Sequence, residues 1–207
     1  MARPAYSQDQ VQAIHEEILA SAVAVFRSDG LEALTLRALA GRMGWTPAAL
    51  YRYFDGKDAL IAALRARGFA ILREGLRSAR SGAADPRDAT RRIMRAYLDF
   101  AIAEPQLFQL AYQLDQRDSD TYPIVRVERE RAFSEALAVG REAVAAGILR
   151  GDPLVATHVL WAGCHGLAAL AIAGQFDLGC NYDQLIDPLL EQLTVPIETR
   201  TVDGHTK

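Results

Sequence analysis

The stretch from Trp45 to Leu60, WTPAALYRYFDGKDAL, holds the side chains of this chain with the clearest potential for chemistry. It combines hydroxyl, guanidinium and ammonium groups, which are the donors that proteins use to hold phosphate oxygens and to contact base edges. Helix signals place Lys57 in the first turn of a helix, where the helix dipole disfavours a cation. A phosphate bound at that helix end would make Lys57 favourable, so an anion is expected there.

The residues around this stretch predict the elements that position it. Thr35 is a suitable N-cap for a short helix over Leu36–Met43, and Gly44 ends that helix. Thr46 followed by proline predicts a second helix that runs to about Phe54. Two short helices joined by a tight turn that contains glycine form a helix-turn-helix, whose second helix enters the DNA major groove.

Helical spacing predicts which side of the second helix is buried. Leu50 and Phe54, four residues apart, face one side and can pack on Leu39 and Met43. The side chains of the opposite side are small or can donate hydrogen bonds. Ala48 permits close approach to a base edge, and Arg52 offers the guanidinium fork that matches guanine. The residues expected to face outward are Ala48, Tyr51 and Arg52.

The whole chain reads as all-α. Ser7 and Gln10 form a capping-box pattern at the start, and Asp55 is expected to cap a long helix that continues to about Arg80, where SGAADP forms a linker. No alternating strand pattern bounded by hairpin turns occurs. Further helices are expected near 87–103, 105–114, 121–146, 153–174 and 182–193, and TVDGHTK is expected to be a frayed tail.

Composition limits the classes of function. The chain has 207 residues, 50% of them hydrophobic, and a formal net charge of -3, so any nucleic-acid site must be a local patch. Residues 1 to 60 carry six basic and seven acidic side chains, but four of the basic ones lie on or beside the helix-turn-helix. These four are Arg37, Arg42, Arg52 and Lys57.

The sequence predicts no metal site, no cofactor and a cytoplasmic location. Cys164 and Cys180 form neither a CxxC motif nor part of a ligand cluster, and the N-terminus lacks the apolar segment of a signal peptide. Residues 153 to 176 contain no charged side chain and are long enough to span a membrane. They are rich in alanine and glycine and lack basic anchors, which favours a buried soluble helix over a membrane span.

The run TLRALAGRMGWTPAALYRYFDGKDAL resembles the DNA-binding domain of the TetR family of bacterial transcriptional regulators. The family pattern has a capping Thr, an apolar-Ala pair, Gly, an apolar residue, Ser or Thr, Leu-Tyr, an aromatic or His before Phe, then Lys and Leu. Trp45 departs from it by being bulkier than the usual aliphatic residue, and Tyr53 stands where His is common. The matching residues are Thr35, Leu39, Ala40, Gly44, Trp45, Thr46, Leu50, Tyr51, Tyr53, Phe54, Lys57 and Leu60.

This resemblance implies specific roles in DNA binding. Phosphates would be held by Thr35, Thr46, Tyr51, Tyr53 and Lys57. The bases would be approached by Pro47, Ala48 and Arg52. By the same resemblance residues 1–58 form the DNA-binding domain and 59–196 an effector-binding and dimerisation domain, with 59–80 as the connecting helix and 197–207 as a flexible tail.

The second half of the chain predicts a homodimer. Small residues repeat at three- and four-residue spacing along the helix near 153–174, which allows another helix to approach closely. LWAGCHGLAALAIAG (160–174) and AEPQLFQLAY (103–112) resemble a regulatory domain of part of the TetR family, which implies a four-helix dimer interface. Candidate interface residues are Ala162, Gly166, Ala169, Ala173, Leu185 and Leu189. Two identical reading heads would require a palindromic operator.

The expected function is a ligand-responsive regulator, by resemblance a repressor, that a small-molecule effector releases from DNA. Aromatic residues at helical spacing could line the effector pocket or simply form core. The candidates are Phe100, Phe108, Tyr112, Trp161 and His165. A constitutive DNA-binding regulator without an effector stays open as an alternative. An enzyme is a remote one, because adjacent Cys164 and His165 point about 100° apart on a helix.

Overall fold

The regular structure of the chain is helical. The computed structural model describes residues 7–113, 121–177 and 179–194, and each regular element in these ranges is a helix, which confirms the all-α class. Two compact units are present. The first comprises Met1–Arg73 and Ala103–Ala132, and the second comprises Glu74–Ile102 and Phe133–Lys207.

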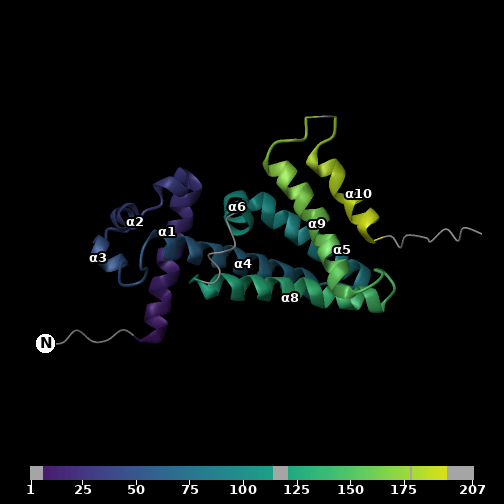
Figure 1. Ribbon diagram of the computed structural model, residues 1–207, viewed down its shortest axis with the longest axis horizontal. Coiled ribbons are helices and arrows are strands. Elements are labelled where there is room, and N and C mark those ends of the chain that lie inside the picture. Colours follow the sequence, from purple (N-terminus) through teal and green to yellow (C-terminus); the bar gives the residue numbers. More distant parts are fainter. Residues whose placement is uncertain (1–6, 114–120, 178, 195–207) are drawn as a thin grey trace, which may run out of the picture. The chain divides into compact units, whose positions relative to one another are not determined.

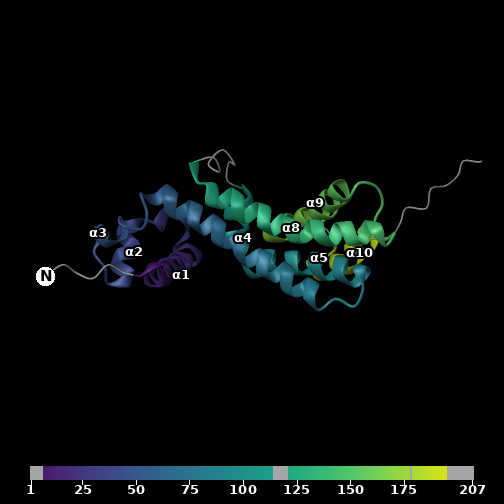
Figure 2. The same ribbon diagram turned by 90° about the horizontal axis from the view of Figure 1, so that it is seen from below.

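The first unit begins with α1 (Gln8–Ala33). The expected capping box is present, since Ser7 Oγ accepts a hydrogen bond from the Gln10 amide and the Ser7 amide donates to Gln10 Oε1. Gly30 has a φ of 79° inside this element, so the helix breaks at this residue and then continues for a short segment. Figures 1 and 2 show α1 beside α2 (Leu36–Met43) and α3 (Pro47–Leu50).

A hydrophobic core joins these helices to the first part of α4 (Lys57–Ser81) and to α6 (Pro105–Gln113). Ile18, Leu39 and Leu60 are fully buried in this core, and α6 contributes Leu107. A smaller cluster around Phe69 includes Val125 from α8 (Pro123–Ala145). The helix-turn-helix therefore rests on a continuous apolar support within its own unit.

The second unit contains the end of α4, α5 (Pro86–Ala103), most of α8, α9 (Pro153–Ile172) and α10 (Tyr182–Thr194). Asp152 caps α9 by accepting hydrogen bonds from two backbone amides. Helices α9 and α10 pack side by side (Figure 1). They approach so closely that a Cβ atom added at Gly163 would lie 2.6 Å from Leu193 Cδ1.

Three predicted helix boundaries need correction. The helix from Thr46 ends at Leu50 instead of Phe54, because the chain then turns through Tyr53. Helix α4 begins at Lys57, so Asp55 is not the residue directly before it. Helix α9 ends at Ile172, two residues earlier than expected. The expected end of the sixth helix at residue 114, the domain end at 196 and the tail 197–207 lie outside the described residues.

Helix α9 is long and apolar enough to cross a membrane on length and composition alone. Its most apolar 18-residue window has a mean hydropathy of 1.5, and 28% of that window is buried. One such helix is weak evidence for a membrane span, because the core helices of soluble proteins meet the same test. Its composition therefore leaves open what covers its remaining surface.

Candidate nucleic-acid interface

Helices α2 and α3 are held by the capping residues that the sequence predicts. Thr35 Oγ1 accepts a hydrogen bond from the Ala38 amide at 3.1 Å, and Thr46 Oγ1 accepts one from the Ala49 amide at 3.3 Å. Gly44 adopts the left-handed conformation with a φ of 69°, which ends α2 and starts the turn. Each threonine hydroxyl keeps its own proton for donation, so a phosphate oxygen can still be bound there.

The buried face of the helix-turn-helix agrees with the prediction. Leu39 and Leu50 are fully buried, Phe54 is 4% exposed, and Met43 packs against the same cluster. His15 stacks on Phe54 with ring centroids 4.7 Å apart. Burial lowers the pKa of His15, and the Glu16 charge opposes this effect. This support holds α3 in one orientation.

The opposite face is open to solvent. Pro47, Ala48 and Arg52 are exposed, and Tyr51 is 58% exposed. Arg52 forms no ion pair or hydrogen bond with another residue in the part of the chain that the structure describes, so its guanidinium remains available to a ligand. Because α3 ends at Leu50, Tyr51 and Arg52 project from the turn that follows the helix.

Trp45 shows what its departure from the family pattern does. The indole is half-buried at the turn and lies 6.4 Å from the Tyr53 ring, centroid to centroid. Tyr53 is also half-buried, so Trp45 restricts the orientation of this phenol. The bulk of Trp45 is accommodated by the neighbouring aromatic residue without loss of the turn.

Lys57 is the first residue of α4 and is half-buried. Its position at a helix N-terminus agrees with the sequence reading, although the helix starts one residue later than an Asp55 cap implies. The N-terminal amides and the ammonium group can share one anion, which removes the conflict with the helix dipole. Among the other basic residues of the helix-turn-helix, Arg42 pairs with Asp29 at 3.7 Å, so part of the basic charge is offset.

The predicted pocket residues fall into two groups, one in each unit. In the first unit, Phe108 is 1% exposed and its ring centroid lies 5.0 Å from that of Tyr112, which also contacts Phe69. In the second unit, Phe100 is 8% exposed. Core packing accounts for the burial of both phenylalanines.

Trp161 and His165 belong to a polar aromatic network that sequence reasoning left incomplete. Trp161 Nε1 donates a hydrogen bond to the Tyr97 hydroxyl at 3.0 Å, and the same oxygen lies 2.8 Å from His165 Nδ1. The Phe133 ring is tilted against the Trp161 ring, with 6.2 Å between their centroids. Burial lowers the pKa of His165, so the neutral ring is favoured. Tyr97 was not predicted as part of this site. The only signal in the sequence is that a buried tyrosine hydroxyl usually has a hydrogen-bond partner.

The Cys164–His165 pair has unsuitable electrostatics for thiolate chemistry. Cys164 is buried, and this burial raises its pKa to about 12. A thiolate would therefore be scarce near neutral pH. Within the described residues, no group of three His, Cys, Asp or Glu side chains is placed to hold a metal ion.

The predicted dimer residues lie on an exposed or half-buried surface of α9 and α10. Ala162, Gly166 and Ala173 are exposed, and Ala169 is half-buried. Leu185 and Leu189 of α10 are half-buried. The prediction missed two valines one and two turns earlier on α9, Val155 and Val159, which are 60% and 56% exposed. The three- and four-residue spacing that identified the small residues continues through both.

Two family models match the sequence. The family described as "Bacterial regulatory proteins, tetR family" matches residues 18–64, and "Tetracyclin repressor-like, C-terminal domain" matches residues 90–193. A curated relative, the HTH-type transcriptional regulator Rv1816 of Mycobacterium tuberculosis, is 28% identical over an alignment that covers 77% of this chain and 79% of the relative. The regulator Mb1846 of Mycobacterium bovis matches to the same extent.

Solved structures share the fold. A protein from Rhodococcus sp. RHA1 superposes with a TM-score of 0.78 and 27% identity, over 92% of this chain and 97% of that one. The TetR family transcriptional regulator PfmR from Thermus thermophilus gives a TM-score of 0.62 and 21% identity, over 86% of this chain and 96% of that one. The second likeness supports the fold alone.

Proposed function

The chain belongs to the tetR family of bacterial transcriptional regulators, and we propose that it is a ligand-responsive repressor that binds a palindromic operator as a homodimer. The observation that carries this proposal is the arrangement of α2 and α3. An apolar core fixes both helices, while the hydroxyl and guanidinium groups predicted to contact DNA lie on the other side. That arrangement suits a major-groove reader.

Two kinds of DNA contact are proposed. Thr35, Thr46, Tyr51, Tyr53 and Lys57 hold phosphates and so fix the register of the protein on the duplex. Pro47, Ala48 and Arg52 approach the bases, and the guanidinium of Arg52 reads guanine through two parallel hydrogen bonds. Thr35, Thr46, Tyr51 and Arg52 are exposed, and the hydroxyl groups of the two capping threonines keep their protons, which supports this division of roles.

The proposed dimer is supported by the surface of α9. Val155 and Val159 are more than half exposed, and Ala162 and Gly166 continue the same apolar stripe. Such a stripe on one helix of a soluble protein needs a cover, and a second copy of the same surface provides one through two-fold symmetry. Leu185 and Leu189 of α10 would complete a four-helix contact.

The domain boundaries are proposed by function. Residues 1–58 read DNA, 59–196 bind the effector and form the dimer, and 59–80 connect the two roles. This division differs from the two packing units because α6 and the start of α8 belong to the first unit. An effector acts if it prefers the conformation with misplaced reading heads, with a typical coupling of about 1–3 kcal/mol.

The effector site is proposed to include Trp161 and His165, with Tyr97 as a further polar group. Phe100 remains a proposed lining residue in the same unit. Phe108 and Tyr112 belong to the first unit, and they are proposed as lining residues within that unit only. We propose no enzymatic activity and no cofactor, and the raised pKa of Cys164 supports the first of these. A cytoplasmic location follows from the proposed role.

Selection of binders from a random duplex DNA library at about 150 mM salt tests the function, because purely electrostatic binding is already weak at that salt concentration. Enrichment of one palindrome would support a dimeric sequence reader. Enrichment of a single half-site would contradict the dimer, and no enrichment by a folded protein would contradict sequence reading by the free protein.

The palindrome then provides the probe for an effector screen. A bound effector must raise the melting temperature by mass action and lower the affinity for the operator. Small molecules that raise the melting temperature without changing operator affinity would contradict ligand control through those molecules. A constitutive regulator would show no coupled change with any member of the screen.

A further inference from the structure

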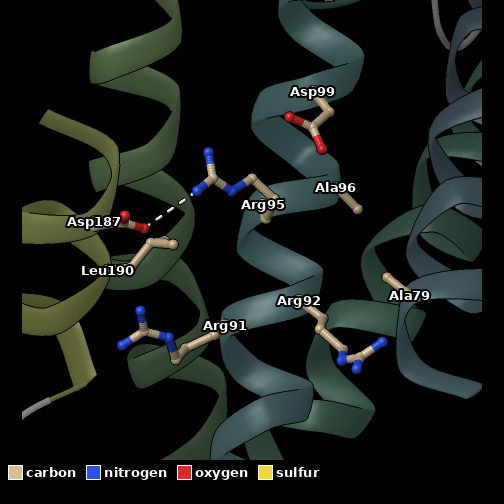
Figure 3. A pocket seen from close by; sticks show the side chains of 8 residues that line it. All are labelled: Ala79, Arg91, Arg92, Arg95, Ala96, Asp99, Asp187 and Leu190. Carbon is tan, nitrogen blue, oxygen red and sulfur yellow. Dashed lines mark hydrogen bonds and ion pairs between the residues drawn. The ribbon is translucent and has the colours of Figure 1, made fainter. Parts of the chain in front are cut away.

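A groove on the second unit crosses α5 between the end of α4 and α10, with a volume of about 330 Å³. Figure 3 shows that three arginines of α5, Arg91, Arg92 and Arg95, line it, together with Asp187 and Leu190 of α10. None of these residues belongs to the proposed DNA, effector or dimer sites. The volume is sufficient for a small molecule.

The three guanidinium groups differ in their ion pairs. Arg92 Nε donates to Asp88 Oδ2 at 2.7 Å, and Arg95 Nη2 donates to Asp187 Oδ1 at 3.2 Å. Arg91 makes no ion pair or hydrogen bond with any residue that the structure describes. Asp88 already accepts hydrogen bonds from the Ala84 amide and from Arg92, and these bonds, with the nearby charges of Arg92 and Arg91, lower its pKa. Arg91 therefore adds positive charge to the groove, and no carboxylate among the described residues forms an ion pair with it.

Arg91 and Arg95 are placed to bind one anion together. They are four residues apart on α5, so their Cβ atoms lie about 5–6 Å apart on one face. In Figure 3 both side chains extend toward α10. Each guanidinium has five N–H donors, and Arg95 uses one of them on Asp187, so donors of both groups remain for a ligand. Two carboxylates also line the groove, Asp187 and Asp99. The Asp187 side chain is 64% exposed and Asp99 is also exposed, so solvent screens both charges.

We propose that this groove binds a phosphate group through Arg91 and Arg95. A phosphate has enough oxygen atoms to accept from two guanidinium groups at once, whereas a carboxylate is matched by the fork of a single one. Leu190 of α10 lies on the side of α5 to which Arg91 and Arg95 extend, and it provides apolar surface for the carbon skeleton of a phosphorylated small molecule. The site lies within one unit and does not depend on DNA binding or on dimer formation.

The test is isothermal titration calorimetry of the full chain without DNA, with inorganic phosphate, glycerol 3-phosphate and acetate as separate probes at matched ionic strength. Both phosphates should bind, and Arg91→Gln with Arg95→Gln should weaken that binding at least tenfold. Arg91→Lys keeps the charge without the fork and should give an intermediate loss. Tighter binding of glycerol 3-phosphate than of inorganic phosphate would identify a phosphorylated small molecule, and the reverse order would identify free phosphate.

Two controls separate this groove from other cationic positions. Arg141 is exposed on α8 in the same unit and has no ion pair with a described residue, so Arg141→Gln matches the loss of charge and should leave binding unchanged. Lys57→Gln identifies any phosphate binding at the N-terminus of α4, where an anion is also expected. The binding that remains in this variant should still be lost when Arg91 and Arg95 are replaced. Equal binding by the Arg91 variants and the native chain would overturn the proposal, as would acetate binding as tightly as phosphate. Far-UV circular dichroism establishes that each variant is folded.

Discussion

The α2–α3 pair and helix α9 expose opposite kinds of side chain. In the pair, Leu39 and Leu50 are fully buried while Tyr51 is 58% exposed. On α9, Val155 and Val159 are 60% and 56% exposed. The first region satisfies its apolar residues within the chain and presents polar groups to a ligand. The second leaves apolar surface that the described residues do not cover, and the proposed dimer would bury it.

Leu50→Ala should produce the largest change in stability, because it removes a core side chain on which the exposed polar residues of the helix-turn-helix rest. The side chain is fully buried, so we expect a loss of about 2–5 kcal/mol in the free energy of unfolding. Urea unfolding monitored by circular dichroism measures this loss. Ala48→Gly, at an exposed position of the same helix, is the comparison. A loss below about 1 kcal/mol for Leu50→Ala would show that the core adapts to the cavity.

Ala162→Glu tests the exposed apolar surface of α9. Two glutamates that face each other across a two-fold contact repel, so dimer dissociation should become at least tenfold easier, or about 1.4 kcal/mol. Analytical ultracentrifugation over a concentration series measures the change. Ala146→Glu, at an exposed position after α8, should leave the mass unchanged. A native chain that is monomeric at micromolar concentration would contradict the dimer itself.

Arg52→Ala and Lys57→Ala divide the polar surface into base and phosphate contacts. The first should cost about 1–3 kcal/mol and relax preference at one base pair. The second should weaken all sequences equally and lower the salt slope by about one. Fluorescence anisotropy with the operator and single-base variants, at several salt concentrations, distinguishes them. An equal loss on every sequence for Arg52→Ala would remove Arg52 from base reading.

The smallest expected effect is a dependence of stability on pH. Burial lowers the pKa of both His15 and His165, so the unfolded chain takes up protons near pH 6.5 that the folded chain does not. The free energy of unfolding should therefore fall as the pH drops below about 6.5. Thermal melts at pH 7.5 and 5.5 measure this fall. His15→Gln and His165→Gln should each reduce it, and no reduction in either variant would contradict the stated cause.

Local signals predicted the helix-turn-helix well because its determinants are close in sequence. Thr35, Gly44 and Thr46 act through hydrogen bonds and backbone conformation within four residues, so their types and spacing are sufficient. The end of α3 was predicted less well. Leu50 and Phe54 can both be buried by a helix that continues to Phe54 or by a shorter helix followed by a turn, so their spacing does not distinguish the two.

Contacts between distant helices could not be predicted in the same way. Tyr97 meets Trp161 and His165 across more than 60 positions of sequence, and helical spacing on one element carries no information about its neighbour. The groove formed by Arg91, Arg95 and Asp187 depends equally on how α5 and α10 pack. The small residues of the stripe on α9 were predicted because one helix alone defines them, whereas Val155 and Val159 of the same stripe were not. What contacts the stripe is not part of that pattern.

The close approach at Gly163 has a consequence for how this chain can vary. A larger residue there would meet Leu193 Cδ1, the far end of a side chain, so either this side chain would change its rotamer or α10 would shift. Gly166, one turn later on the same helix, has no atom within 4 Å of an added Cβ among the described residues, so folding of the isolated chain would tolerate many residues. The residue types found at position 166 would therefore be limited by a molecule that contacts this surface. Those found at position 163 would be limited by packing within the chain.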